Sequence, residues 1–344
     1  METSSKAIRV LQVGDYPPPA GGVATHVEEL FKAVRASGGE SQVLDIGKGQ
    51  LPADGVQGAG SMPAFAAHLT AKAARGFRIH LHTNGANPKS WILAQACAAA
   101  GRLSGGAMIT LHSGLGPAWL SEKPARRTAA RAVLSQFRNV IAVSGQIRDA
   151  LAECGVKDAV VLPAFSPASV KAGSAPQGFS RESGDLLFCA MVAPRPEYGE
   201  QILLEAFAAV RQQLPQARLA LYGPGSELVH ADGVQGFGEL QRPQALALMA
   251  ACDVFVRPTL ADGDSVSVRE AIALGRIVVA TNVGTRPPET QLVEAGNVAS
   301  LADGLIAAAG KSGAPASAPA ADPFSQILSL YGFTEDRCAA SAVS

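Results

Sequence analysis

Short apolar runs alternate with helix-period segments along the first half of the chain. The run at 7–13 predicts a buried strand, and after a loop rich in Pro and Gly the segment 25–37 has the spacing of a helix that stops at Gly38. Further strand-like runs occur at 41–46, 77–82, 107–112, 139–143 and 159–162, with Ala-rich helical stretches between several of them. This alternation predicts a parallel sheet covered by helices on both faces.

A second alternating series follows a stretch that is poor in large apolar side chains. Residues 169–184 are rich in Ser, Gly and Pro, as is typical of an interdomain linker. Because 344 residues exceed what one hydrophobic core usually organises, the pattern predicts two doubly wound α/β domains, at 1–168 and 185–308. We expect residues 309–322 to be a flexible tether, and 323–344 to hold a C-terminal helix that docks back on the first domain.

Cysteine content and charge distribution narrow the class of protein. The five cysteines are widely spread and form no CxxC pair, which argues against a disulfide framework or a zinc site and fits a reducing cytoplasm. No apolar run reaches about 18 residues, so we expect any membrane contact to be peripheral. The net charge of zero conceals an asymmetry, because residues 1–150 have 16 Lys and Arg against 9 Asp and Glu, whereas residues 151–344 have 13 against 20.

The first predicted strand leads into the loop GDYPPPAGGVATH, in which Gly21 and Gly22 precede a helix. Glycine lets backbone N–H groups approach an anion at a helix N-terminus, where the helix dipole also favours negative charge. A tight turn that needs glycine for its geometry alone explains this loop equally well when the loop is taken by itself.

The second domain contains two acids seven residues apart in the segment VRPTLADGDSVSVREAIALGRIVVATNVG. If residues 265–274 are helical, Asp262 lies in the loop before the helix and Glu270 lies inside it, so that a ligand along the helix N-terminus can touch both. A diphosphate would use the free N–H groups near residues 263–267, and the carboxylates would accept hydrogen bonds from sugar hydroxyls. Two acids near a helix start are more often caps and solvated charges.

Both features together resemble the retaining family 4 glycosyltransferases (glycosyl transferases group 1) of the GT-B fold. The family loop PxxGGVaxHvxxL is matched by PPPAGGVATHVEEL, and the family pattern aDvfvxPSxxEgfgxxxxEAmaxGxPVvat is matched by CDVFVRPTLADGDSVSVREAIALGRIVVAT. The similarity spans most of residues 8–310, and the second motif is the more specific one. It implies two Rossmann-like domains that face each other across a cleft.

The resemblance implies roles for the matching positions. Glu270 would hold the donor ribose, Asp262 would face the donor sugar, and His112 would lie near the transferred sugar. By its own sequence, His112 is a histidine at a strand end, where a structural role is the usual one. The other matching positions would bind the diphosphate, at Gly21, Gly22, Ser265, Val266 and Ser267, and the nucleobase, at Phe237 and Gly238.

This sequence departs from the family at three places. The first acid is usually Glu and is here the shorter Asp262. The family segment GRLxxxKG, whose Arg and Lys clamp the diphosphate, has Ala193 and Tyr198 at those positions, and Arg195 is the nearby cation that could substitute. The region 285–310 is also shorter than is usual in the family.

We expect a glycosyltransferase that works without a metal or other cofactor. The triplet at 262–264 also spells DxD, the metal–diphosphate motif of a different glycosyltransferase fold, but the resemblance favours neutralisation by a helix N-terminus and a cation. The expected reaction moves a sugar with retention from a nucleotide-sugar donor to an acceptor in polysaccharide or glycolipid biosynthesis. A nucleotide-sugar epimerase and a binding homologue without transfer activity remain as alternatives.

The basic first half of the chain suggests which class of acceptor the enzyme uses. After Trp119, the segment KPARRTAARAVLSQFR has five cations, Lys123, Arg126, Arg127, Arg131 and Arg138. Such a segment can lie on an anionic membrane and receive a carbohydrate or lipid-linked acceptor, which would place the enzyme in the cytoplasm at the inner face of the membrane. An ordinary solvated helix explains the same pattern equally well. No nucleic-acid partner is expected.

Overall fold

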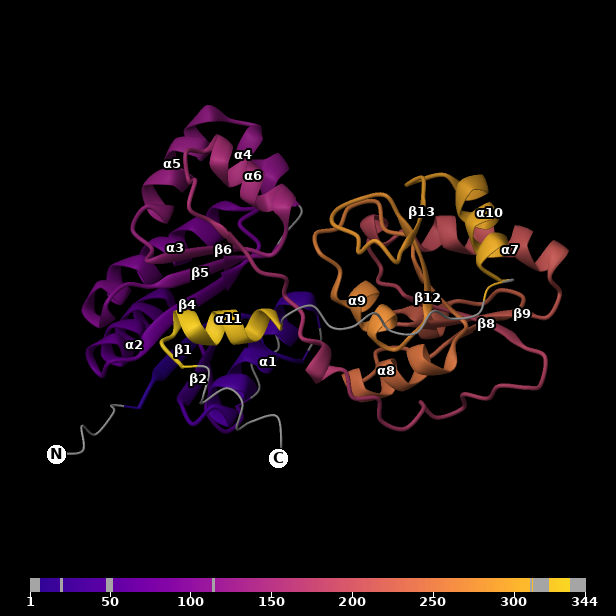
Figure 1. Cartoon of the computed structure of the whole chain (residues 1–344), viewed down its shortest axis with the longest axis horizontal. Helices are drawn as coiled ribbons and strands as arrows, with labels where there is room; N and C mark the ends of the chain where they lie inside the picture. The colour runs from indigo at the N-terminus through magenta and orange to yellow at the C-terminus, as the bar shows by residue number, and fades with distance from the viewer. Residues whose placement is uncertain are drawn as a thin grey trace. The chain divides into compact units, whose positions relative to one another are not determined.

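The computed structural model of the chain describes residues 7–18, 21–47, 52–112, 115–309, 311 and 322–334. The chain divides into two compact units, residues 1–165 with 321–344 and residues 166–320 (Figure 1). Most of the predicted tether at 309–322, and residues 335–344 of the predicted C-terminal segment, lie outside the described residues.

The first unit is built on a parallel sheet whose strand order is β3-β2-β1-β4-β5-β6-β7. Its strands are β1 (Arg9–Gly14), β2 (Glu40–Asp45), β3 (Val56–Gly58), β4 (Arg78–Thr83), β5 (Met108–Leu111), β6 (Asn139–Ala142) and β7 (Val160–Val161). The strand order reverses between β1 and β4, which pair through residues 10–13 and 78–81. Doubly wound sheets bind ligands beyond the carboxyl ends of the strands at such a switch point.

Helices cover both faces of this sheet. They are α1 (Gly22–Ala36), α2 (Met62–Ala74), α3 (Pro88–Gly101), α4 (Leu115–Ser121), α5 (Pro124–Leu134), α6 (Gly145–Glu153) and α11 (Pro323–Leu330). On one face, Leu69, Ala94 and Leu134 belong to a continuous apolar core supplied by α2, α3 and α5. On the other face, α11 packs with α1, so that a helix from the end of the chain, yellow in Figure 1, completes the first unit.

The second unit has a parallel sheet in the order β10-β9-β8-β11-β12-β13. Its strands are β8 (Leu186–Met191), β9 (Ala217–Tyr222), β10 (Val234–Gly236), β11 (Val254–Arg257), β12 (Ile277–Thr281) and β13 (Gln291–Val293), and its helices are α7 (Glu200–Gln213), α8 (Arg242–Ala251), α9 (Val266–Ala273) and α10 (Val298–Ala309). One core lies under α7 and α10, and a second lies under α8 and α9. The prediction of two doubly wound parallel sheets is confirmed.

The stretch 169–184, predicted to be a linker, is fastened to the second unit. The Arg181 guanidinium donates to both carboxylate oxygens of Asp253 at 2.8 Å, and Gly173 N donates to Pro243 O at 2.8 Å. Phe179 packs against the core under α8 and α9. These contacts fix the course of a segment that has no helix or strand of its own after the short 3₁₀ turn Pro167–Ser169.

Candidate functional site

In the second unit, the loop between β11 and α9 lies beyond the carboxyl end of the sheet. The strand order reverses between β8 and β11, so this loop follows a strand at the switch point of the sheet. The apolar run of β11 ends at Arg257, and the loop continues to Ser265, which precedes α9. The loop therefore occupies the position at which doubly wound sheets bind ligands.

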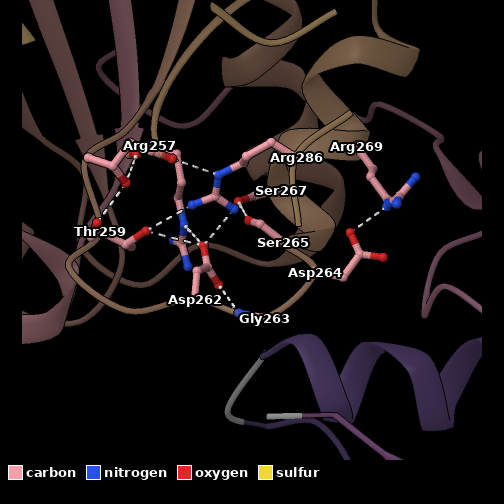
Figure 2. A network of polar contacts seen from close by, with 10 residues as sticks. Arg257, Thr259, Asp262, Gly263, Asp264, Ser265, Ser267, Arg269 and Arg286 are labelled. Carbon is pink, nitrogen blue, oxygen red and sulfur yellow. Dashed lines mark hydrogen bonds and ion pairs between the residues drawn. The ribbon is translucent and has the colours of Figure 1, made fainter. Parts of the chain in front are cut away.

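The centre of this loop is the Asp262 carboxylate, which is bound on several sides (Figure 2). Its Oδ2 accepts hydrogen bonds from Arg257 Nε at 3.1 Å and Thr259 Oγ1 at 3.2 Å, and it lies 3.1 Å from Arg286 Nη1. Its Oδ1 accepts from Gly263 N at 3.1 Å. In the structure, the acid predicted to face the donor sugar is thus engaged by two arginines.

Burial and charge act in opposite directions on this cluster. Burial alone would raise the pKa of Asp262, but Arg257 and Arg286 outweigh it, and the pKa of this carboxyl is lowered. Burial opposes the charge of Arg257, yet Asp262 raises the pKa of its guanidinium. For Arg286, burial lowers the pKa and Asp262 only partly offsets it. Because an arginine side chain stays protonated in proteins, the cluster contains two buried cations around one anion at neutral pH.

Asp264, the second acid of the DxD triplet, has a different partner. Arg269 Nε donates to Asp264 Oδ1 at 2.7 Å, whereas Oδ2 is buried without a hydrogen-bond partner among the described residues. Burial raises the pKa of Asp264, the nearby Asp262 raises it further, and Arg269 counteracts both. The two DxD carboxylates are therefore held by different arginines. Within the described part of the chain, no group of three or more His, Cys, Asp and Glu side chains could hold a metal ion.

The start of α9 has no side-chain cap. Ser265 is the N-cap residue, but its side chain makes no capping hydrogen bond, and its hydroxyl lies 3.1 Å from the Ser267 hydroxyl instead. The first-turn N–H groups of Val266 and its neighbours consequently receive no acceptor from the cap side chain. Asp264, the residue before Ser265, pairs with Thr285, the residue before Arg286 (Figure 2). The predicted diphosphate-binding positions 265–267 and Asp262 thus lie together.

Glu270 lies within α9 and is held by an arginine from the neighbouring helix. Arg242, the first residue of α8, donates from Nε to Glu270 Oε1 at 2.8 Å and from Nη2 to Ser169 Oγ at 2.9 Å. The Glu270 side chain is only 10% exposed. The carboxylate predicted to bind the ribose is therefore held in place by Arg242.

The predicted base-binding residues follow β10. Phe237 lies with its ring centroid 6.1 Å from that of Phe179 and packs against the core under α8 and α9. Gly238 has a left-handed backbone with φ of +68° and donates from its N–H to Ser226 Oγ at 3.0 Å. Both residues directly follow β10, the edge strand that pairs with β9, and they are distant in sequence from the Asp262 loop.

Arg195, predicted to replace the missing diphosphate clamp, lies on a neighbouring turn. Its side chain is 61% exposed, lies 3.5 Å from Glu197 Oε1, and donates to Tyr198 Oη at 3.2 Å. The guanidinium carbon of Arg195 is 5.0 Å from the centre of the Tyr198 ring, and that of Arg257 is 5.2 Å from the same ring. Tyr198, which stands at the position of the family Lys, thus contacts two cations.

In the first unit, the Gly21 and Gly22 loop leads directly into α1. Gly21 is the N-cap residue with an extended backbone (φ of −171°), and a Cβ added there would meet nothing within 4 Å. Neither backbone strain nor crowding within the described residues requires glycine at position 21. A tight turn therefore does not explain this residue, whereas close approach of a ligand to the backbone would.

His112 directly follows β5 and lies in a group of four buried or half-buried histidines. His112 Nε2 is 3.3 Å from His82 Nδ1, and the ring of His26 lies 4.9 Å from that of His112. Burial lowers the pKa of His112 and of His80 to about 3. Burial together with the neighbouring histidines lowers the pKa of His26 and His82 as well. All four rings are neutral at physiological pH.

A chain of hydrogen bonds fixes the tautomer of His112. Gln12 Nε2 donates to Tyr331 Oη at 3.2 Å, so the amide oxygen of Gln12 is the acceptor for His82 Nε2 at 2.8 Å. His82 Nδ1 then accepts from His112 Nε2, which leaves Nδ1 as the accepting nitrogen of His112. Tyr331 Oη also contacts His80 Nδ1. Tyr331 directly follows α11, so the end of the chain takes part in this network.

The sequence interpretation missed four arginines of the second unit: Arg242, Arg257, Arg269 and Arg286. A sequence signal for Arg257 does exist, because this residue is a charge at the end of the otherwise apolar run CDVFVR. The carboxyl end of such a strand is where a doubly wound sheet binds its ligands. We find no comparable sequence signal for Arg286, which lies in a loop. Tyr331 was also missed, because its partners belong to strands far away in the sequence.

The two sheets, each with a switch point and helices on both faces, define a protein of the two-domain Rossmann-like class. Residues 20–165 match the family Glycosyltransferase Family 4, and residues 183–310 match Glycosyl transferases group 1. The chain therefore belongs to the family 4 (group 1) glycosyltransferases and has the GT-B fold. No curated protein matches the chain.

Solved structures share the fold at low sequence identity. Sucrose-phosphate synthase from Thermosynechococcus elongatus has a TM-score of 0.67 and 17% identity, with 94% of this chain and 98% of that chain covered. Anabaena HepE in complex with UDP and glucose has a TM-score of 0.62 and 16% identity, with 97% of each chain covered. An α,α-trehalose-phosphate synthase (UDP-forming) from Burkholderia xenovorans, in complex with glucose-6-phosphate, has a TM-score of 0.65 and 14% identity, covering 89% and 93%.

Proposed function

We propose that this glycosyltransferase transfers a sugar with retention from a nucleoside diphosphate sugar. The observation that carries the proposal is the uncapped N-terminus of α9, which directly follows the loop in which Asp262 holds the buried Arg257 and Arg286 at the switch point of the second sheet. Backbone N–H groups and guanidinium groups can together neutralise the diphosphate as it leaves. Glu270, held by Arg242, would accept the ribose hydroxyls.

The proposed chemistry needs no metal ion and no covalent sugar–protein intermediate. The bond between the anomeric carbon and the diphosphate oxygen breaks as the acceptor oxygen bonds to the same face of the sugar. The departing diphosphate takes the proton of the acceptor hydroxyl. His112, a neutral imidazole with Nδ1 as its accepting nitrogen, would receive a hydrogen bond from a hydroxyl of the sugar.

A ligand screen tests the donor class. HepE was solved with UDP and glucose, so UDP-glucose is the first compound, followed by GDP- and ADP-sugars. A ligand at 100 times its dissociation constant stabilises a protein by about 2.7 kcal/mol, which thermal unfolding detects. Binding of one base series, followed by EDTA-resistant release of the nucleoside diphosphate in the presence of acceptors, would support the proposal. Abolition of turnover by EDTA and rescue by Mn²⁺ would favour the DxD arrangement instead.

The same assay separates the two alternatives. An epimerase would interconvert the sugar of a nucleotide sugar without any acceptor, whereas the proposed enzyme would leave the sugar configuration unchanged. A binding homologue would be stabilised by the donor but would release no nucleoside diphosphate above background, even by hydrolysis.

For the acceptor, we propose a lipid-linked glycan of polysaccharide or glycolipid biosynthesis, reached from an anionic membrane surface. Trp91 of α3 stacks on Trp119 of α4, with ring centroids 6.3 Å apart. Ile92 and Leu115, on the same two helices, are 59% and 51% exposed. Apolar side chains of this kind together with cations are typical of peripheral membrane surfaces. No helix in the described part of the chain is long and apolar enough to cross a membrane.

Not every cation of the basic segment is available to a membrane. Arg126 lies 2.5 Å from Glu122 and its guanidinium lies 4.3 Å from the Trp119 ring, whereas Lys123 and Arg131 are exposed. We expect the protein to sediment with anionic vesicles at low salt and to be released at high salt. The double variant Lys123→Gln, Arg131→Gln should bind less, and Arg148→Gln on α6 serves as the matched control. Absence of binding at low salt would point to a soluble acceptor.

A further inference from the structure

We propose that Arg257 is the diphosphate-binding cation of this chain, and that Asp262 and Arg286 position it. The inference deepens the proposed function and rests on it, since it assumes a nucleoside diphosphate donor. It assigns the missing family clamp to a strand end rather than to the exposed Arg195.

The first support is the place of the Arg257 side chain. The family clamp has lost both cations, with Ala193 and Tyr198 at the two positions. The guanidinium of Arg257 lies 5.2 Å from the centre of the Tyr198 ring. A positive charge from β11 therefore lies next to the position of the family Lys. A guanidinium that stacks on an aromatic ring is held in a fixed plane, which suits the binding of phosphate oxygens.

The second support is an excess of buried positive charge. Arg257 is 8% exposed and the Arg286 side chain is 3% exposed. In the ion pairs that the loop forms among the described residues, three arginines, 257, 269 and 286, meet two aspartates, 262 and 264, so these five side chains sum to one positive charge. A buried charge without full compensation is unfavourable. A bound diphosphate would supply the missing negative charge.

The third support is an unsatisfied donor. Arg257 Nε is bound to Asp262, but Nη1 is buried without a hydrogen-bond partner among the described residues. A buried N–H group without an acceptor is rare in native proteins and calls for an explanation. This donor belongs to the arginine cluster beside the uncapped start of α9 (Figure 2), so an oxygen of a bound phosphate would satisfy it.

The contacts of Asp262 and Arg286 give them a positioning role. Arg286 donates from Nε to Thr281 O at 3.1 Å and from Nη2 to Thr259 Oγ1 at 3.2 Å. Its Nη1 makes no hydrogen bond among the described residues but lies 3.1 Å from Asp262 Oδ2, so the guanidinium of Arg286 is held on each of its nitrogens by the protein. Asp262 holds Arg257 through Nε alone. The aspartate at position 262 thus orients a phosphate-binding arginine, instead of reaching for the donor sugar as the longer family glutamate does.

The experiment measures binding of UDP, GDP and ADP, and of inorganic pyrophosphate as a probe that needs no base, to the full chain by calorimetry. We expect Arg257→Gln to weaken the preferred nucleoside diphosphate and pyrophosphate at least tenfold, while the matching nucleoside binds as before. Arg276→Gln is the control, because Arg276 is a half-buried arginine of the same unit that donates to the backbone of Leu274 and Cys252. Its affinities should stay within twofold of the wild type.

A rescue variant separates binding from a structural role. Arg257→Gln combined with Tyr198→Lys restores the family cation, and we expect it to recover most of the lost affinity for the diphosphate. A merely structural role of Arg257 would not respond to a lysine at position 198. Thermal unfolding of the ligand-free variants verifies that they are folded.

The outcomes distinguish the two proposals. If the wild type binds neither a nucleoside diphosphate nor pyrophosphate, the proposed function fails and the present inference fails with it. If the wild type binds and Arg257→Gln binds equally well, only the role of Arg257 is overturned. The folded Arg257→Gln variant can also lose as much affinity for the nucleoside as for the nucleoside diphosphate. Arg257 would then maintain the structure of the domain instead of binding phosphate, and this result would also overturn the inference.

Discussion

At position 262 the chain has an aspartate where the resemblance implies a glutamate, and the shorter side chain is bound within the protein. Its carboxylate lies within 3.1 to 3.2 Å of Arg257 at the end of β11, Thr259 in its own loop and Arg286 in the loop after β12. The pKa of this carboxyl is lowered although burial opposes the shift. The folded protein therefore stabilises the ionised form of Asp262 through its two arginines.

Replacement of Asp262 by asparagine should destabilise the protein. Removal of one partner of a buried ion pair typically costs about 3–5 kcal/mol, because the remaining charge is left without compensation. Here two arginines would remain. We expect chemical denaturation to show a loss of this size for Asp262→Asn, compared with less than about 1 kcal/mol for Asp232→Asn, whose side chain is 90% exposed. Equal stability of wild type and Asp262→Asn would contradict the described ion pairs.

Glu270 permits a separate test of donor binding. A carboxylate that accepts ribose hydroxyls contributes through hydrogen bonds to a charged group, worth roughly 1.5–3 kcal/mol. The Glu270→Gln variant should therefore bind the preferred nucleoside diphosphate about 10- to 150-fold more weakly. In contrast to Arg257→Gln, it should also weaken the nucleoside without phosphates and leave pyrophosphate binding nearly unchanged. An unaltered dissociation constant would remove Glu270 from the ribose site.

At the scale of elements, the Asp262 loop depends on close contact with the loop after β12. Thr285 N donates to Gly263 O at 2.8 Å, and Gly284 has a left-handed backbone with φ of +69°. A Cβ at Gly284 would lie 2.3 Å from Gly263 O. The loop that holds the arginine cluster can therefore keep its course only with glycine at position 284.

Gly284→Ala should impair the site through this contact. We expect weaker nucleoside diphosphate binding and a lower unfolding temperature, because the methyl group must displace residues 262 and 263. Gly296→Ala is the matched control, since Gly296 has a similar φ of +75° but its added Cβ would come no nearer than 3.8 Å to Leu260. The control has the backbone strain of about 1 kcal/mol without the collision. Similar nucleotide affinities for both variants would show that the loop tolerates displacement.

Most of the elements could be predicted because their apolar runs are continuous. The strands β1, β8, β11 and β12 have three or more consecutive buried positions, which periodicity detects well. The edge strands β3, β10 and β13 are missing from the prediction, since each has only three residues and a mixed burial pattern. Short pairings of this kind are decided by neighbouring strands and not by their own sequence.

That Asp262 lies close to the start of α9 could be predicted, whereas the ion pairs around Asp262 and Glu270 could not; that this is the donor site stays a prediction. The spacing of Asp262 and Glu270 and the resemblance to family 4 placed the site at the start of α9. The pairing of Asp262 with Arg286, and of Glu270 with Arg242, depends on which loops and helices lie side by side in the folded domain. A single sequence gives no such information. The proposed roles of Arg195 and His112 in donor binding stay predictions.

At the scale of the whole molecule, the buried histidines of the first unit should make it sensitive to mild acid. His80 and His112 have a folded pKa of about 3, against about 6.5 in an unfolded chain. Above pH 6.5 both states hold these rings neutral and no stability is lost. As the pH falls from 6.5 towards 3, only the unfolded state takes up the protons, so the free energy of unfolding decreases.

Each of these two histidines should lower the free energy of unfolding by about 1.4 kcal/mol at pH 5.5 relative to pH 8. The only tryptophans of the chain, Trp91 and Trp119, both lie in the first unit, so their fluorescence reports on the unfolding of this unit alone. Urea titrations at the two pH values should show a loss of about 3 kcal/mol from this pair, with more from His26 and His82. Equal midpoints at pH 8 and 5.5 would mean that these rings are not buried as described.

The position of α11 also affects how the protein is synthesised. Phe324, Ile327 and Tyr331 close the α1 face of the first sheet, but a ribosome makes them only after the entire second unit. At about 5–20 residues per second, the apolar side chains of Leu30 and Val34 stay uncovered for about 15 to 60 seconds after their synthesis. During this interval the nascent first domain is a target for chaperones and for aggregation. The synthesis of α11 after the second unit thus sets the earliest time at which the first domain can become native.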